Sequence, residues 1–206
     1  RGLFDYNQVY YDNEKTPFAF IVWNPVNYGG IDATKMYPSI APFSGDNALA
    51  SIVSYDVSKD TGEMTPLDAD NWLVSPELTG KAQTVNFRVN CMGEDHPEDY
   101  EVLWSEGGTE AADFTLVSKA TVSAADWRQV NFALPEGAKR FAIRHTTKVV
   151  ESGSGTGYES YPHLFLVDDV TYAPKGVILR GYMVYRDGTL LGYTPELSFT
   201  DTDAPA

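Results

Sequence analysis

The chain has 206 residues, 43% hydrophobic and 13% aromatic, and such a composition can bury a sizeable core, which excludes a wholly disordered protein. Its formal net charge of −14 at pH 7 gives a surface that repels phosphate backbones and anionic lipids, so we expect no nucleic-acid partner. No apolar run is long enough to span a bilayer, so we expect no membrane insertion, and the single cysteine, Cys91, excludes an intrachain disulfide.

The first part of the chain alternates short apolar runs with connections rich in proline and glycine. Residues 18–23 and 46–54 are predicted strands. Prolines punctuate residues 31–45, which we interpret as a long surface connection, and residues 58–68 are polar and loop-like. Residues 70–78, DNWLVSPEL, begin with a polar turn and end at a proline that cannot donate to a strand ladder, so we interpret them as the opening strand of a β-sandwich.

The middle of the chain is marked by strict alternation of apolar and polar residues, which predicts half-buried strands. The pattern recurs about every ten residues with turn residues between, and this is typical of an antiparallel sandwich or barrel. No stretch keeps a helical period for three turns, although residues 109–113 and 123–127 each allow a single turn. The expected strands are residues 85–91, 100–104, 114–118, 130–134, 141–145 and 164–170.

The composition changes at residues 173–176, APKG, which we interpret as a module boundary. A strand, a hairpin turn at Asp187 and Gly188 and a returning strand follow it. A hairpin cannot form an independent core. We therefore expect residues 1–173 to form the main domain, and residues 174–206 to be the start of a second β module or a β extension docked on the first.

The sequence carries no catalytic signature. His96, His145 and His163 lie far apart and lack the spacing of metal ligands. His145 shares a predicted strand face with Phe141 and Ile143, so we expect a hydrogen-bonded core histidine. A Ser-His-Asp triad can assemble from distant residues, but nothing in the sequence points to one, and we expect no enzymatic activity.

Two aspartates, Asp168 and Asp169, interrupt the apolar strand at residues 164–170. Successive strand residues point to opposite faces, so one aspartate is expected on each face. A carboxylate among apolar side chains is unfavourable unless it is compensated, which leaves a metal ion, an arginine or several backbone N–H groups as its partner. The acidic turn at residues 94–99 either binds a cation or is simply solvated.

The loop at residues 149–162 is long, rich in glycine and serine, and carries Tyr158 and Tyr161. Tyrosines on such a loop either stack on sugar rings or anchor the loop to the protein. We take both as candidate ligand-binding residues.

Five motifs in order resemble the cleaved adhesin domain family, the repeated adhesin and haemagglutinin modules of gingipain-type bacterial surface proteins. The resemblance spans about residues 40–172, and DNWLVSPEL is similar to the family's DNWLVTPEL. GYMVYRDG, at residues 181–188, resembles the opening of the immunoglobulin-like module that follows such domains. The other four motifs are YEVLWS (100–105), WRQV followed by LP (127–135), FAIRH (141–145) and LVDDV (166–170).

The resemblance implies an all-β, jelly-roll, galactose-binding-like antiparallel β-sandwich that carries structural calcium. In the family the acidic returning strand meets the N-terminal segment, so the implied calcium ligands are Asp168, Asp169, Asp5, Ser44 and Asp46.

The implied function is a non-catalytic, extracellular adhesion or ligand-binding module at a bacterial cell surface. Its partners would be a host glycan or an extracellular-matrix protein, together with other modules of the same parent chain. The alternative is a carbohydrate-binding or spacer module appended to a secreted hydrolase or protease.

Overall fold

The computed structural model describes residues 20–27, 32–58, 60–123, 126–154, 157–173, 182–186, 189–194 and 199–200. Within these ranges the regular structure is β-strand apart from short 3-10 helices, as the alternating sequence pattern predicts. None of the described helices is long and apolar enough to cross a bilayer.

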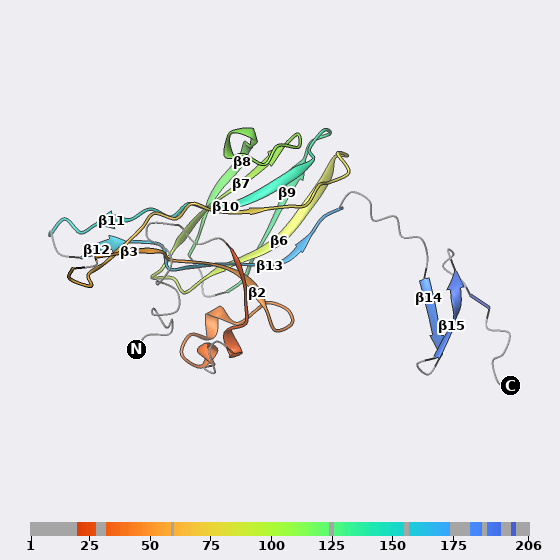
Figure 1. The fold of residues 1–206 in the computed structure, drawn as a ribbon, viewed down its shortest axis with the longest axis horizontal. Coiled ribbons are helices and arrows are strands. Elements are labelled where there is room, and N and C mark those ends of the chain that lie inside the picture. The colour runs from red at the N-terminus through yellow and green to blue at the C-terminus, as the bar shows by residue number, and fades with distance from the viewer. Residues whose placement is uncertain are drawn as a thin grey trace.

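Two antiparallel sheets form the body of the molecule (Figure 1). In chain order their strands are β1 (Ile21–Trp23), β2 (Ala48–Ile52), β5 (Asn71–Val74), β6 (Gln83–Cys91), β7 (Glu98–Ser105), β8 (Thr115–Val122), β9 (Arg128–Leu134), β10 (Arg140–His145) and β13 (Leu164–Thr171). The five-stranded sheet has the order β1-β2-β13-β6-β9, and the four-stranded sheet has the order β5-β10-β7-β8. The all-β jelly-roll sandwich is therefore confirmed, with β5 at the edge of one sheet and β13 in the centre of the other.

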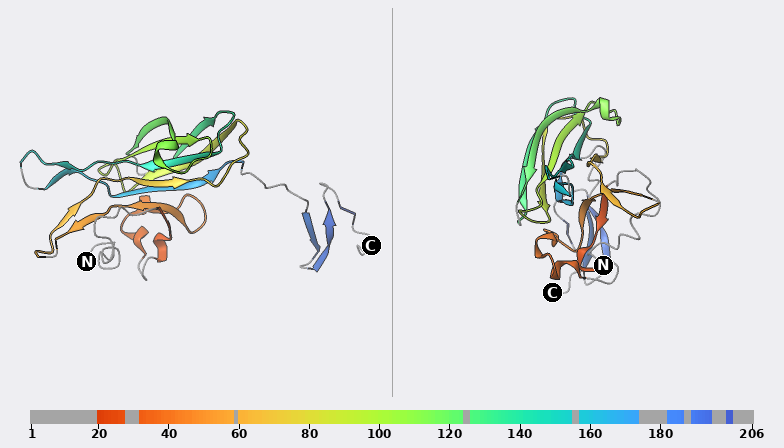
Figure 2. Two further views of the ribbon diagram at one scale, coloured as in Figure 1. Left: turned by 45° about the horizontal axis from the view of Figure 1, so that its top comes forward. Right: turned by 90° about the vertical axis from the view of Figure 1, so that its left-hand side faces the viewer.

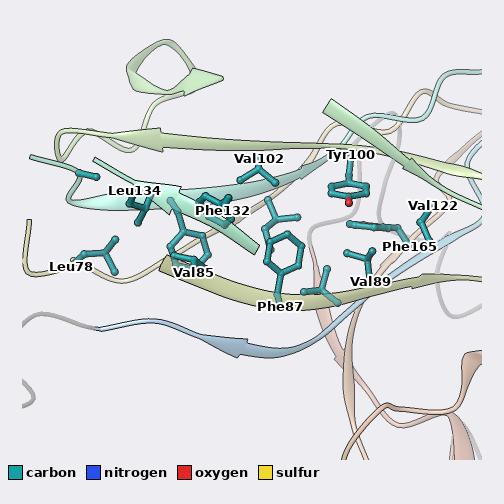
Figure 3. Packing of buried hydrophobic residues seen from close by; sticks show 14 of the residues in the cluster. Leu78, Val85, Phe87, Val89, Tyr100, Val102, Val122, Phe132, Leu134 and Phe165 are labelled. Atoms are coloured by element: carbon teal, nitrogen blue, oxygen red, sulfur yellow. The ribbon is translucent and has the colours of Figure 1, made fainter. Parts of the chain in front are cut away.

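The main core lies between the two sheets and is built from every second residue of the long strands (Figure 3). Val85, Phe87 and Val89 of β6 face this core, as the alternation predicts. Tyr100 of β7 stacks on Phe165 of β13, with their ring centroids 5.2 Å apart. Each large apolar side chain buried in this way contributes about 1.5–3 kcal/mol to stability.

A second apolar cluster covers the outer face of the five-stranded sheet, because β13 is apolar on both faces. Leu164 and Leu166 of β13 are fully buried there, with Trp23 and Ile40. Three 3-10 helices form the cover, visible beneath the sheet in Figure 2: η1 (Pro25–Asn27), η2 (Ala33–Lys35) and η3 (Pro38–Ile40). The expectation of a mere surface connection at residues 31–45 is wrong, since this segment supplies part of a core.

Three further pairs of strands form small two-stranded sheets. They are β3 (Tyr55–Val57) with β4 (Met64–Pro66), β11 (Val150–Glu151) with β12 (Tyr158–Ser160), and β14 (Tyr182–Arg186) with β15 (Thr189–Thr194). The first two hairpins extend from the same end of the sandwich (Figures 1 and 2). The loops expected at residues 58–68 and 149–162 therefore contain strands. The third hairpin agrees with the sequence, although its turn lies outside the described residues, and the domain boundary at residue 173 stays a prediction.

Candidate functional site

Asp168 lies in β13 where the pairing of β13 with β6 shifts register. Its Oδ2 accepts hydrogen bonds from the backbone N–H groups of Phe43, at 2.9 Å, and Ser44, at 3.2 Å. Its Oδ1 accepts from the N–H of Asp169 at 2.7 Å. Backbone N–H groups, one of the three partners left open by the sequence, thus compensate this carboxylate.

Asp169 reaches the same segment as Asp168. It has a φ of +50°, and its Oδ1 accepts a hydrogen bond from the Ser44 hydroxyl at 2.5 Å. The expectation of one aspartate on each face of the strand is wrong, because a β-bulge and a left-handed residue break the alternation on which it rested.

The acidic edge formed by Ser44, Asp168 and Asp169 offers only part of a calcium shell. Two carboxylates and a hydroxyl are oxygen donors of the kind that Ca²⁺ takes, but the ion uses roughly six to eight of them. Asp46 is exposed and makes no hydrogen bond or ion pair to any described residue, and Asp5 lies outside the described residues. The described part of the chain holds no group of three His, Cys, Asp or Glu residues placed to bind a metal.

The two candidate tyrosines lie in a row of aromatic rings at the hairpin end of the sandwich. Tyr161 stacks on His163 at 4.1 Å between centroids, and its ring meets those of Tyr55 and Tyr158 edge-on. Tyr161 also packs against the second apolar cluster, so it anchors its loop. His163 in turn lies 4.0 Å from the ring of His96. Burial, and then repulsion from His96, lower the pKa of His163. A ligand-binding role for either tyrosine stays a prediction.

His145 is the hydrogen-bonded core histidine that the sequence predicts. Its Nδ1 lies 2.7 Å from Ser51 Oγ and its Nε2 lies 2.8 Å from Glu98 Oε2. This order of groups matches that of a hydrolase triad. All three residues are 0% exposed, however, so in this structure no substrate reaches the Ser51 hydroxyl.

Glu98 was expected in an exposed or cation-binding acidic turn, and that expectation is wrong. Its Oε1 accepts hydrogen bonds from the backbone N–H groups of His163, at 2.6 Å, and Leu164, at 2.8 Å. Its Oε2 accepts from the Thr147 hydroxyl at 2.7 Å. The buried carboxylate therefore joins the starts of β7 and β13 to the end of β10.

An open groove of about 520 Å³ crosses the outer face of the four-stranded sheet, and no sequence feature singled it out. Arg144 of β10 lies along it, with Nε 2.6 Å from Asp70 Oδ1, Nη1 3.2 Å from Glu101 Oε2, and its guanidinium over the ring of Trp72. Lys119 pairs with Glu101 at 2.6 Å. Every cation here has an anionic partner, so the groove has no excess of positive charge.

These ion pairs lower the pKa of two carboxyl groups that bind Arg144. The hydrogen bond from Arg144 lowers the pKa of Asp70. Burial opposes the ionisation of Glu101, but the hydrogen bonds from Lys119 and Arg144 outweigh it, so the pKa of Glu101 also lies below its ordinary value.

Comparison with known proteins decides the family. The sequence profile described as the Cleaved Adhesin Domain matches residues 28–173, well over half of the chain. The chain belongs to the cleaved adhesin domain family.

Relatives of this cleaved adhesin domain include Protease PrtH, Lys-gingipain HG66 and Hemagglutinin A, all from Porphyromonas gingivalis. Each is 30% identical over 137 residues, or 60% of this chain, which covers 14%, 8% and 5% of their respective lengths. Among solved structures, the K1 cleaved adhesin domain of Lys-gingipain from P. gingivalis W83 is 22% identical with a TM-score of 0.49, covering 79% of this chain and 95% of that domain.

The polar residues of the family motifs hold this cleaved adhesin domain together. Asp70 of DNWLVSPEL and Glu101 of YEVLWS both bind Arg144 of FAIRH. Asn71 donates to Ser51 in the buried network at 2.8 Å, and Asp168 of LVDDV fixes the segment at residues 43–44. The motifs that revealed the family are therefore structural at these positions.

Proposed function

We propose that this cleaved adhesin domain is a non-catalytic, extracellular ligand-binding module of a larger bacterial surface protein, and that it serves adhesion to a host glycan or matrix protein. The observation that carries the proposal is the family match over residues 28–173, with Hemagglutinin A among the relatives. The small share of each relative that the chain covers supports a role as one module among several.

The non-catalytic part of the proposal is supported by the burial of the Ser51–His145–Glu98 network, which no substrate can reach without unfolding. The second candidate is a carbohydrate-binding or spacer module within a secreted protease, and the relatives named Protease PrtH and Lys-gingipain favour it. In the first candidate function the module attaches the bacterium to host cells or matrix. In the second it binds carbohydrate for a neighbouring domain or only positions that domain.

Array binding followed by cell retention tests the proposal. The 206-residue chain, fluorescently labelled, is applied to glycan and matrix-protein arrays, and beads coated with it are then mixed with host cells. An adhesin gives saturable binding to one ligand class and retains beads, and soluble ligand of that class releases them. A spacer gives neither signal. Saturable glycan binding without bead retention favours the carbohydrate-binding alternative.

We also propose that Ca²⁺ stabilises the domain at the acidic edge, held by Asp168, Asp169 and Ser44, with Asp46 and Asp5 as further donors. The support is the convergence of two carboxylates on the segment that carries Ser44. Ca²⁺ bound only to the folded state stabilises it by mass action, by about 2.7 kcal/mol when free Ca²⁺ is a hundredfold above Kd.

A further inference from the structure

A second open hollow, of about 510 Å³, lies on the outer face of the five-stranded sheet where β13, β6 and β9 adjoin. The size falls within the range of small-molecule binding sites. Its lining residues are Asn86, Phe87, Arg88, Gln129, Asp169 and Thr171.

Strand alternation brings planar and hydroxyl side chains together in this hollow. In β6, Asn86 and Arg88 alternate with the core residues Val85, Phe87 and Val89, so their side chains lie on the outer face. The ladders set Asn86 beside Asn131 on one side and Thr171 on the other, and they set Arg88 beside Gln129. The register thus creates two adjacent rows of polar groups.

These side chains hold one another in place. Asn86 Nδ2 donates to Thr171 Oγ1 at 3.3 Å, Arg88 Nη2 donates to Gln129 Oε1 at 3.4 Å, and Gln129 Nε2 donates to Asn131 Oδ1 at 3.2 Å. Asn86 Oδ1 and Asn131 Nδ2 have no partner among the described residues and remain available to a ligand. The hollow therefore offers donors and acceptors that are already oriented, which lowers the entropy lost on binding.

The charge of the hollow selects the class of ligand. Arg88 and Asp169 are its charged residues, so its lining is neutral in a chain with a net charge of −14. A polyanion gains nothing from it, because the positive charge of Arg88 is balanced by Asp169. Sugar hydroxyls both donate and accept, and amides, a hydroxyl and a guanidinium match them.

Two aromatic rings lie next to the lining residue Arg88. The guanidinium of Arg88 lies 3.7 Å above the ring centroid of Phe43, which is 44% exposed. Phe43 meets Trp127 edge-on, and Trp127 Nε1 donates to the carbonyl of Ala41 at 2.9 Å. Arg88 covers one face of the Phe43 ring, and the exposed remainder of the ring offers an apolar surface of the kind that packs against a pyranose.

Backbone strain at the same place is an independent sign of a site. Asp169, which lines the hollow, is the one non-glycine residue with a positive φ in the described ranges. It lies within the β-bulge between Asp168 and Thr171. Residues in this conformation and bulges both concentrate at functional sites, where they aim side chains that a regular strand would not.

We propose that this hollow binds one uncharged saccharide unit, a hexose or an N-acetylhexosamine, of a glycan ligand. The proposal rests on the proposed ligand-binding function and assigns it to the sheet face rather than to the tyrosines of the hairpin end.

The test is NMR titration of the isotopically labelled 206-residue chain with galactose, mannose and N-acetylglucosamine at millimolar concentrations. The side-chain amides of Asn86, Gln129 and Asn131 should shift with one of these sugars. Asn86→Ala combined with Gln129→Ala should weaken binding about tenfold or more, because hydrogen bonds to the ligand are lost. Ser118→Ala, on the exposed face of β8, is the matched control and should bind like the parent chain.

Arg88→Lys keeps the charge but removes the flat guanidinium, so it should also weaken binding while the melting temperature shows that the variant is folded. If the double variant binds as tightly as the parent and Tyr158→Ala with Tyr161→Ala abolishes binding, the sheet-face site is wrong and the ligand-binding function stands. If none of the sugars shifts any resonance, the saccharide site is overturned, whatever the arrays show for matrix proteins.

Discussion

His145 and Glu98 are both fully buried, 47 residues apart in the chain, and their Nε2 and Oε2 atoms lie 2.8 Å apart. Because a carboxylate oxygen accepts, His145 donates from Nε2, and its Nδ1 is hydrogen-bonded to the Ser51 hydroxyl. The same carboxylate takes two backbone N–H groups at the start of β13. One buried side chain therefore satisfies donors from β10, from β13 and from the segment between β12 and β13.

Glu98→Gln should destabilise the domain strongly. In one orientation the new NH₂ group faces the backbone N–H groups of His163 and Leu164, and in the other it faces Nε2 of His145. Either orientation leaves a buried donor unpaired. We expect a loss of about 3 kcal/mol or more in the free energy of unfolding, measured by urea titration. Glu94→Gln makes the same change at an exposed position of the same turn and should stay within about 0.5 kcal/mol of the parent. Equal stability of the two variants would refute the role given to Glu98.

Asp70→Asn should change how the free energy of unfolding depends on pH in the acid range. The pKa of Asp70 is lowered by Arg144, so the pair contributes stability above the pKa of an unfolded aspartate, about 3.9, and loses it as the pH falls through the folded pKa. The free energy of unfolding of the variant should be lower than that of the parent at pH 7 and equal to it in strong acid.

The size of this effect is less than about 1 kcal/mol, because the Asp70 carboxylate is half exposed and screened by water. Urea titrations at a series of pH values measure it, with Asp60→Asn, an exposed aspartate on another loop, as control. A difference between parent and Asp70→Asn that persists unchanged in strong acid would contradict the assignment.

Removal of Ca²⁺ should lower the melting temperature, and added Ca²⁺ should restore it. Asp168→Asn should abolish that response, whereas Asp126→Asn, an exposed aspartate outside the acidic edge, should keep it. Calorimetry with and without EDTA gives the melting temperatures, and elemental analysis gives the bound metal. If EDTA has no effect and no calcium is found, the backbone N–H groups of residues 43, 44 and 169 are the whole compensation for Asp168.

Substitution of Tyr161 and substitution of Tyr158 should have different effects on stability. Tyr161→Ala removes a ring that packs on His163 and on the second apolar cluster, so it should cost about 2 kcal/mol of stability. Tyr158→Ala should cost less than about 1 kcal/mol of stability and, because the sugar is proposed to bind at the sheet-face hollow, it should leave sugar binding unchanged. Urea titration and binding isotherms on both single variants and the double variant test this, and unchanged affinity in the double variant would exclude the hairpin from the binding surface.

The sequence predicted those elements whose side-chain pattern is set by a single core. Residues 85–91 and 141–145 alternate because one face meets the core and the other meets water, and the period reports this directly. The sequence did not predict the short hairpins, because a strand of two or three residues is too short to show a period. The sequence did not predict the buried role of residues 31–45, because their apolar residues are separated by prolines and follow neither the strand period nor the helix period.

The site residues were harder to place, because their partners are distant in the chain. Glu98 looks like its acidic neighbours until the fold brings the N–H groups of His163 and Leu164 to it. The sequence predicted that Asp168 and Asp169 point to opposite faces of the strand, but the β-bulge brings both carboxylates to Ser44. The groove at Arg144 and the hollow at Arg88 depend on strand register, which an isolated strand sequence does not contain.

The central position of β13 has a consequence for how the domain is made. Its partners β2 and β6 precede it by a long stretch of chain, and neither side of its ladder can form until residues 164–171 have been synthesised. Until then both apolar clusters lack their shared strand. Contacts of such high sequence separation also make folding slow. The strand that joins the two apolar clusters is therefore the last strand of the sandwich to be synthesised.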